Sequence, residues 1–153
     1  MKTLMENWNR FVNEEEQTVN EQEQDLYSLV SPYTEQFAKT GEAMADMLAA
    51  KGSPQIKLTK DVYSKASTKD LLGPSGELTR ELGDMMRSDP EAFEKKYNVK
   101  GINQLVEKIR TNLMLTALRS MSRRLDSLGY KISKAQNASN EESAITYATW
   151  TKE

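Results

Sequence analysis

One regular apolar repeat, between Gly101 and Gly129, constrains the fold more than any other feature of this chain. Its apolar residues recur every three or four positions, the spacing that places side chains on one side of an α-helix. They are Ile102, Leu105, Val106, Ile109, Leu113, Ala117, Met121, Leu125 and Leu128. Because Gly129 is suited to follow the last helical residue, the sequence predicts a helix of about 27 residues over 102–128 at the centre of the core.

Weaker patterns predict further helices before this one. An apolar pattern interrupted at Pro32 predicts a helix that ends at Gly52-Ser53-Pro54. Ser75 can cap another helix, and Asp89 followed by proline is typical of a new helix start. Residues 144–150 are ambiguous, because they fit either a short strand or a last helical turn.

These patterns together predict an all-α fold. A chain of 153 residues is expected to form a single small helical domain. The prediction is about five helices around helix 102–128, with a peripheral amphipathic helix at the N-terminus. The expected divisions are an amphipathic leader or docking helix at 1–14, an acidic polar linker or helical extension at 15–25, a helical core at 26–135 and a polar tail at 136–153.

The residue types that are absent limit the chemistry. The chain has no histidine and no cysteine, which removes the commonest general base near neutral pH and most zinc and copper ligands. No glycine-rich phosphate-binding loop is present either. We therefore expect a protein that is not an enzyme, with no catalytic residues, no cofactor and no metal.

A carboxylate enzyme is the rival hypothesis in that class. It would require acidic side chains to converge on a hard cation such as magnesium. The candidates are Glu14, Glu15, Glu16, Glu21, Glu77, Glu81 and Asp84. A solvated helix face explains the run at Glu14 more simply.

No stretch of the sequence is apolar enough to span a membrane or to act as a secretory signal. A spanning helix needs about 18 or more apolar residues, and charges at Lys2, Glu6 and Arg10 interrupt the first twelve positions. We expect no membrane association, and a protein that stays in the compartment where it is made. The lack of cysteine is compatible with a reducing cytoplasm.

Charge is distributed unevenly along the chain. Residues 1–50 carry three basic and ten acidic groups, whereas residues 95–135 carry ten basic and two acidic groups. Basic groups in the second segment are candidates for phosphate or nucleic-acid contact; they are Lys95, Lys96, Lys100, Lys108, Arg119, Arg123, Lys131 and Lys134. The favoured alternative is that they solvate the helix or pair with the acidic N-terminal half.

The N-terminal segment carries a candidate docking face. Leu4, Trp8, Phe11 and Val12 recur at helical spacing before a polar stretch that has almost no apolar residue. An indole there has little local core, so Trp8 either anchors the chain to another surface or is clamped back onto the domain. A protein partner is the expectation, with its identity and the oligomeric state left open.

The first fourteen residues also resemble the capsid-targeting leaders of internal head proteins of large tailed bacteriophages. The resemblance rests on the opening Met1-Lys2-Thr3 and on Phe11-Val12-Asn13-Glu14. Those leaders begin with Met-Lys and end in an aromatic residue, an aliphatic residue, any residue and glutamate, where the prohead protease cuts. By resemblance, Val12, Asn13 and Glu14 form the processing site, and the mature chain begins at Glu15. Residues 15–153 carry no such resemblance.

The sequence thus favours a non-enzymatic, macromolecule-binding protein. The resemblance implies a phage virion or head-assembly component, whose leader docks on the scaffold or head proteins in the cytoplasm of a bacterial host before the remainder is packaged in the phage head. The alternative is a cytoplasmic regulatory binding module that contacts nucleic acid or a protein through the basic 95–134 surface. Only the first hypothesis predicts removal of the leader.

Overall fold

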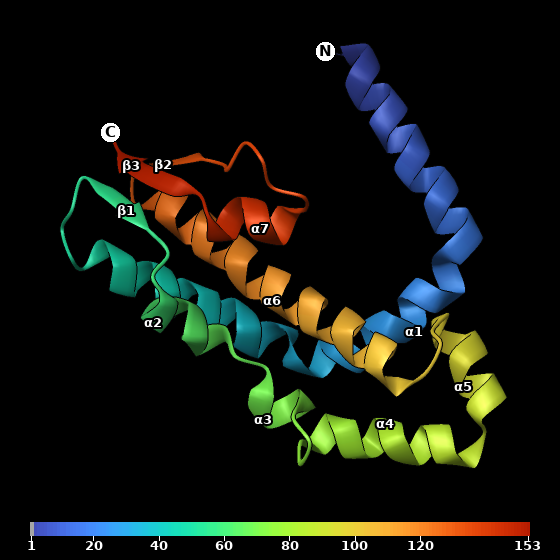
Figure 1. Cartoon of the computed structure of the whole chain (residues 1–153). Coiled ribbons are helices and arrows are strands. Elements are labelled where there is room, and N and C mark those ends of the chain that lie inside the picture. The colour runs from blue at the N-terminus through green and yellow to red at the C-terminus, as the bar shows by residue number, and fades with distance from the viewer. Residues whose placement is uncertain (1) are drawn as a thin grey trace.

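The computed structural model describes the backbone of residues 2–153 and the side chains of residues 24–153. Two long helices form its frame: α1 (Lys2–Ala49) and α6 (Ile102–Ser127). They run in the same direction, because Ala38 lies beside Ser120 and Asp46 lies beside Arg124 (Figure 1). The helix predicted from the apolar repeat is confirmed as α6, which ends one residue early, with Leu128 as its C-cap.

Helix α1 is longer than the sequence predicts, since it continues through Pro32. Proline removes one hydrogen bond of a helix and commonly bends it without ending it. Figure 1 shows α1 changing direction between its first half, which leads away from the remainder of the molecule, and its second half, which packs along α6. The backbone of residues 15–25 lies within α1.

Five short elements and a longer helix lead from the end of α1 back to the start of α6 (Figure 1). They are β1 (Gln55–Lys57), α2 (Lys60–Tyr63), a 3-10 turn η1 (Ser64–Ala66), α3 (Lys69–Leu72), α4 (Glu77–Ser88) and α5 (Pro90–Tyr97). The predicted start of α5 is confirmed, because Asp89 accepts a hydrogen bond from the Ala92 N–H at 3.2 Å.

The predicted cap of α4 is wrong by one residue. The N-cap residue is Gly76 and not Ser75, so no side chain caps the first turn of α4. A Cβ atom at Gly76 would lie 2.2 Å from the Leu71 carbonyl oxygen. The turn before α4 therefore leaves no room for a side chain at the N-cap position. This steric limit outweighs the preference of serine for that position.

Three short strands correct the all-α prediction. After α6 come β2 (Tyr130–Ser133), α7 (Glu141–Thr146) and β3 (Thr149–Lys152). Strand β3 is the centre of an antiparallel sheet of order β1-β3-β2, in which Trp150 pairs with both Ile56 and Ile132. The fold is thus mostly helical with a small sheet, and the ambiguous segment 144–150 contains both the end of α7 and the start of β3.

The core lies between α1, α6 and the inner face of this sheet. Helix α1 contributes Val30, Phe37, Met44 and Leu48, and α6 contributes Leu105, Ile109, Leu113, Leu118, Met121 and Leu125. The C-terminal segment also enters the core, because Ile145, Ala148 and Trp150 are buried. The segment 136–153 therefore belongs to the packed body of the protein, although most of its residues are polar.

Candidate functional site

Helix α7 is fastened to α6 through two adjacent glutamates in its first turn. The Asn140 side chain caps α7 by accepting a hydrogen bond from the Ser143 N–H at 2.8 Å. Glu141 then accepts two hydrogen bonds from Arg119, at 2.8 Å from Nε and 2.6 Å from Nη2. This two-pronged pair lowers the pKa of Glu141 and raises that of Arg119.

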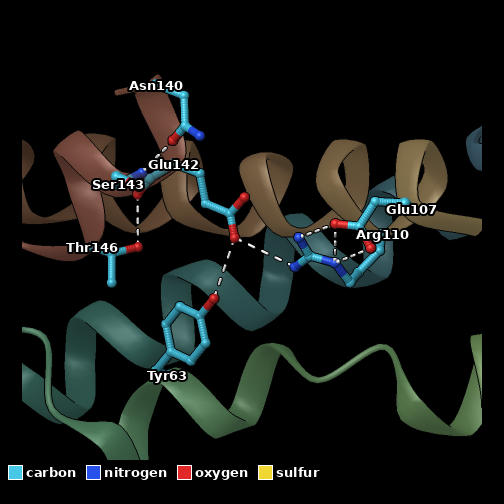
Figure 2. Close-up of polar contacts among 7 residues, drawn as sticks. All are labelled: Tyr63, Glu107, Arg110, Asn140, Glu142, Ser143 and Thr146. Carbon is cyan, nitrogen blue, oxygen red and sulfur yellow. Dashed lines mark hydrogen bonds and ion pairs between the residues drawn. The ribbon is translucent and has the colours of Figure 1, made fainter. Parts of the chain in front are cut away.

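The second glutamate, Glu142, is a junction of three elements. Figure 2 shows its Oε1 between the Tyr63 hydroxyl, which donates at 3.3 Å, and Arg110 Nη1, at 3.4 Å. Arg110 also donates to Glu107 at 2.7 Å through Nη2, and this hydrogen bond lowers the pKa of Glu107. Burial, followed by the charge of Glu142, raises the pKa of Tyr63. Each of these charged groups has a partner, so the cluster ties α2 and α7 to α6.

A cleft of about 410 Å³ opens beside the Arg119–Glu141 pair. Its walls come from α6, from β2 and the residue after it, from α7 and from β3; we refer to it as the α6–β2 cleft. It combines three cations, two carboxylates and an apolar wall, and its lining residues are Arg119, Ser122, Arg123, Asp126, Tyr130, Ile132, Lys134, Glu141, Ile145 and Trp150.

The structure brings together three of the eight basic residues that the sequence singled out. Arg119, Arg123 and Lys134 line the cleft. Lys131 lies on β2, with its Nζ 3.8 Å from Glu153 Oε1. The other four belong to α5, the loop after it and the first half of α6 (Figure 1). Lys108 and Arg119 are about 17 Å apart along the axis of α6, at 1.5 Å per residue. The basic residues therefore form two groups at the two ends of α6.

Some of the basic residues near α5 interact with the C-terminal end of that helix. Lys108 Nζ donates to the carbonyl oxygens of Tyr97 and Asn98, at 3.4 and 3.1 Å. These carbonyls belong to the C-terminal end of α5, where a positive charge is favourable. Lys96 Nζ lies 5.5 Å from the centre of the Tyr97 ring. Two of the four cations thus stabilise the end of α5.

Pairing between the basic segment and the acidic N-terminal half occurs once within the part of the chain whose side chains are described. Arg124 Nε donates to Asp46 Oδ1 of α1 at 3.0 Å. Arg110 and Arg119 pair with α7 instead, through Glu142 and Glu141. Pairing with the acidic N-terminal half therefore involves one basic residue of this segment, among those described, and solvation of the helix is the other part of that expectation.

A second groove, of about 460 Å³, lies where α1 begins to pack on α6. Its surface is mainly apolar, and its lining residues are Leu26, Gln104, Glu107, Lys108, Thr111, Asn112 and Leu115. Tyr27, the next residue of α1, is 65% exposed.

The predicted docking and processing residues lie outside the described side chains. Leu4, Trp8, Phe11 and Val12 belong to this part of α1, as do Asn13 and Glu14 of the processing site. The docking face and the processing site therefore remain predictions from the sequence.

Sequence reasoning missed the residues that complete the cleft. The sequence patterns place Tyr130 and Ile132 in the helical core and Ile145 and Trp150 in the ambiguous segment 144–150, and they assign no binding role to Asp126 or Glu141. The alternation of buried and exposed residues along β2 was a usable signal, since Tyr130 is buried and Lys131 exposed. Four residues are too few to make that signal specific.

Over the described residues, no group of three or more acidic side chains is arranged to hold a metal ion, and no helix is long and apolar enough to cross a membrane. Comparison of the chain with protein-family models, with curated proteins and with solved structures finds no match.

Proposed function

We propose that this chain is a non-enzymatic binding protein that docks onto a protein partner through the first half of α1, as a component of phage head assembly. The observation that carries the proposal is the form of α1. It is one helix from Lys2 to Ala49, whose buried residues begin at Val30, among those described, and whose first half leads away from the body (Figure 1).

The dimensions of this projecting part suit a docking helix. Residues 2–24 extend over about 35 Å at 1.5 Å per residue. The sequence repeats apolar residues at Leu4, Trp8 and Phe11 along it, a spacing typical of helices that lie in a groove of a partner. A helix with such a stripe is stabilised chiefly by covering that stripe, since an isolated helix of this composition is marginal in water.

The head-assembly part of the proposal rests on the resemblance of residues 1–14 to capsid-targeting leaders. On this proposal the helix binds scaffold or head proteins, and the remainder is packaged in the head. The site of action is then the cytoplasm of a bacterial host and, after packaging, the phage particle.

Processing at Val12-Asn13-Glu14 requires a local opening of α1. The helix includes these residues, and its intrahelical hydrogen bonds there must break before a protease can bind the segment in an extended form. Residues 13–25 contain almost no apolar side chain, so the sequence offers few apolar contacts that could oppose such an opening. The polar stretch behind the leader therefore favours cleavage even within a helix.

Incorporation into particles tests the docking helix. The double variant Trp8→Ala/Phe11→Ala should lose incorporation into phage heads, with a melting temperature close to that of the unchanged chain, because both aromatic residues precede the core. Tyr27→Ala is the matched control, since it removes an exposed aromatic side chain from the same helix. A double variant that enters particles normally, or that melts many degrees lower, would contradict the proposal.

A second candidate function is a regulatory module that contacts nucleic acid through the basic residues. It is favoured by Arg123 and Lys134, which make no ion pair within the described part of the chain and share one cleft. This function predicts binding of the intact chain to a DNA duplex that weakens steeply between about 50 and 200 mM salt. Fluorescence anisotropy of a labelled duplex at several salt concentrations measures that slope.

A further inference from the structure

We propose that the α6–β2 cleft is a binding site for a small phosphate monoester that carries a ring. The proposal concerns a different face of the molecule from the docking helix and does not rest on it. It is argued from the charges of the cleft, from its apolar wall and from one buried N–H group without a partner.

The three cations of the cleft differ in whether they form an ion pair. Arg119 is held by two hydrogen bonds to Glu141. Arg123 and Lys134 make no ion pair among the described residues, although Lys134 is near enough to Glu141 to help lower the pKa of that carboxyl group. Two cations that lie at one opening and form no ion pair among the described residues match a ligand group with two negative charges. A phosphate monoester is such a group above its second pKa of about 6.

The carboxylates of the cleft restrict the ligand further. Asp126 lines the same opening as Arg123, and Glu141 remains negative beside Lys134. With three cations and two carboxylates, the lining carries a small net positive charge. That balance favours one phosphate group over a polyphosphate, whose additional charges would meet the carboxylates.

The volume of the cleft is large enough for a ligand that is bigger than a phosphate group. Its volume of about 410 Å³ lies within the range typical of small-molecule sites. Ile132, Ile145 and Trp150 supply an apolar wall, and a ring is the compact group that such a wall accommodates.

Trp150 adds the most specific observation. The side chain is fully buried in the centre of the sheet, and its Nε1–H has no hydrogen-bond partner among the described residues. Buried N–H groups nearly always have a partner, and this one, which has none among the described residues, belongs to a side chain in the wall of the cleft. Because the indole is fully covered, a bound ring would affect its N–H from across that wall and not through a direct hydrogen bond. A ring that fills the cleft will therefore change the environment of this indole N–H.

Nuclear magnetic resonance of the indole N–H groups tests the proposal on the full-length chain. The chain has two tryptophans, so Trp8→Phe leaves the Trp150 signal alone without altering the cleft. Phenyl phosphate should shift this signal in a saturable way at millimolar concentrations and pH 7.5. Phenol and inorganic phosphate, which each supply only one half of the ligand, should bind at least tenfold more weakly.

Charge variants identify the binding residues. Arg123→Gln/Lys134→Gln should weaken phenyl phosphate binding at least tenfold, with no change in the melting temperature. Lys131→Gln, an exposed neighbour on β2, should leave binding unchanged. A Trp150 signal that phenyl phosphate does not move would overturn the proposal, as would equal binding by the charge variant. Tighter binding of a single-stranded oligonucleotide at the same signal would assign the cleft to nucleic acid instead.

Discussion

At the scale of single residues, Gly41 sets how closely α1 approaches α6. A Cβ atom at this position would lie 2.1 Å from the Ala117 carbonyl oxygen and 2.8 Å from Ser120 Cβ. Ser120 uses the same close approach, since its hydroxyl donates to the Ala38 carbonyl oxygen at 2.6 Å. The backbone contact between the two long helices therefore depends on the absence of a side chain at Gly41.

Gly41→Ala should lower the free energy of unfolding by roughly 1–3 kcal/mol or more, because the added methyl group forces the two helices apart. Gly83→Ala on α4 is the matched control, since its Cβ would meet only the Arg87 guanidinium, at 3.6 Å. That change should be neutral or stabilising by up to about 1 kcal/mol. Urea unfolding of both variants measures the difference, and equal effects would contradict the close-contact account.

The Arg119–Glu141 pair gives stability a pH dependence. The hydrogen bonds from Arg119 lower the pKa of Glu141 in the folded state. The resulting stabilisation is present above the unfolded pKa of about 4.3 and is lost as the pH falls through the lower folded value. Because the two side chains are 54% and 42% exposed, we expect the pair to contribute less than about 1 kcal/mol.

Arg119→Gln should therefore reduce stability at pH 7 and have a smaller effect as the pH falls toward 3 and Glu141 takes up a proton. Lys39→Gln is the control, because it removes a fully solvated pair with Glu35 and should change little at either pH. Urea unfolding at the two pH values gives the comparison. An Arg119→Gln effect that is as large at pH 3 as at pH 7 would rule out this role of the pair.

At the scale of elements, the sequence predicts best what depends on nearby residues. Helix α6 is long, and its apolar repeat lies within one segment, so its position could be predicted almost to the residue. The start of α5 could be predicted for the same reason, because Asp89 and Pro90 act within one turn.

The sheet could not be predicted, because its pairing is non-local. Strand β3 pairs Trp150 with Ile56, which is more than ninety positions earlier, and each strand has only three or four residues. Periodicity is not readable over so few positions. The cleft was missed for the same reason, since Tyr130, Ile132 and Trp150 come together only when β2 and β3 pair.

Strand β3 should contribute strongly to stability despite its position near the C-terminus. Trp150→Ala should lower the free energy of unfolding by roughly 3–5 kcal/mol, since the indole is fully buried. Thr151→Ala changes an exposed residue of the same strand and should have an effect within about 0.5 kcal/mol. If Trp150→Ala unfolded at nearly the same urea concentration as the unchanged chain, the C-terminal segment would not belong to the core.

At the scale of the whole molecule, the body and the first half of α1 should be separable. The buried residues, among those described, begin at Val30. Deletion of residues 1–14 should therefore leave the melting temperature within about 2 °C of the full chain, since no described core contact is lost. A large decrease in melting temperature would show that Trp8 and Phe11 are clamped onto the body, which is the alternative to docking.

The most direct test of the proposed role is the intact mass and N-terminal residue of the chain recovered from assembled phage particles. The account predicts a chain that begins at Glu15, with the docking helix cut after it has directed the protein into the head. A chain recovered with Met1–Glu14 still attached would contradict the processed-leader account.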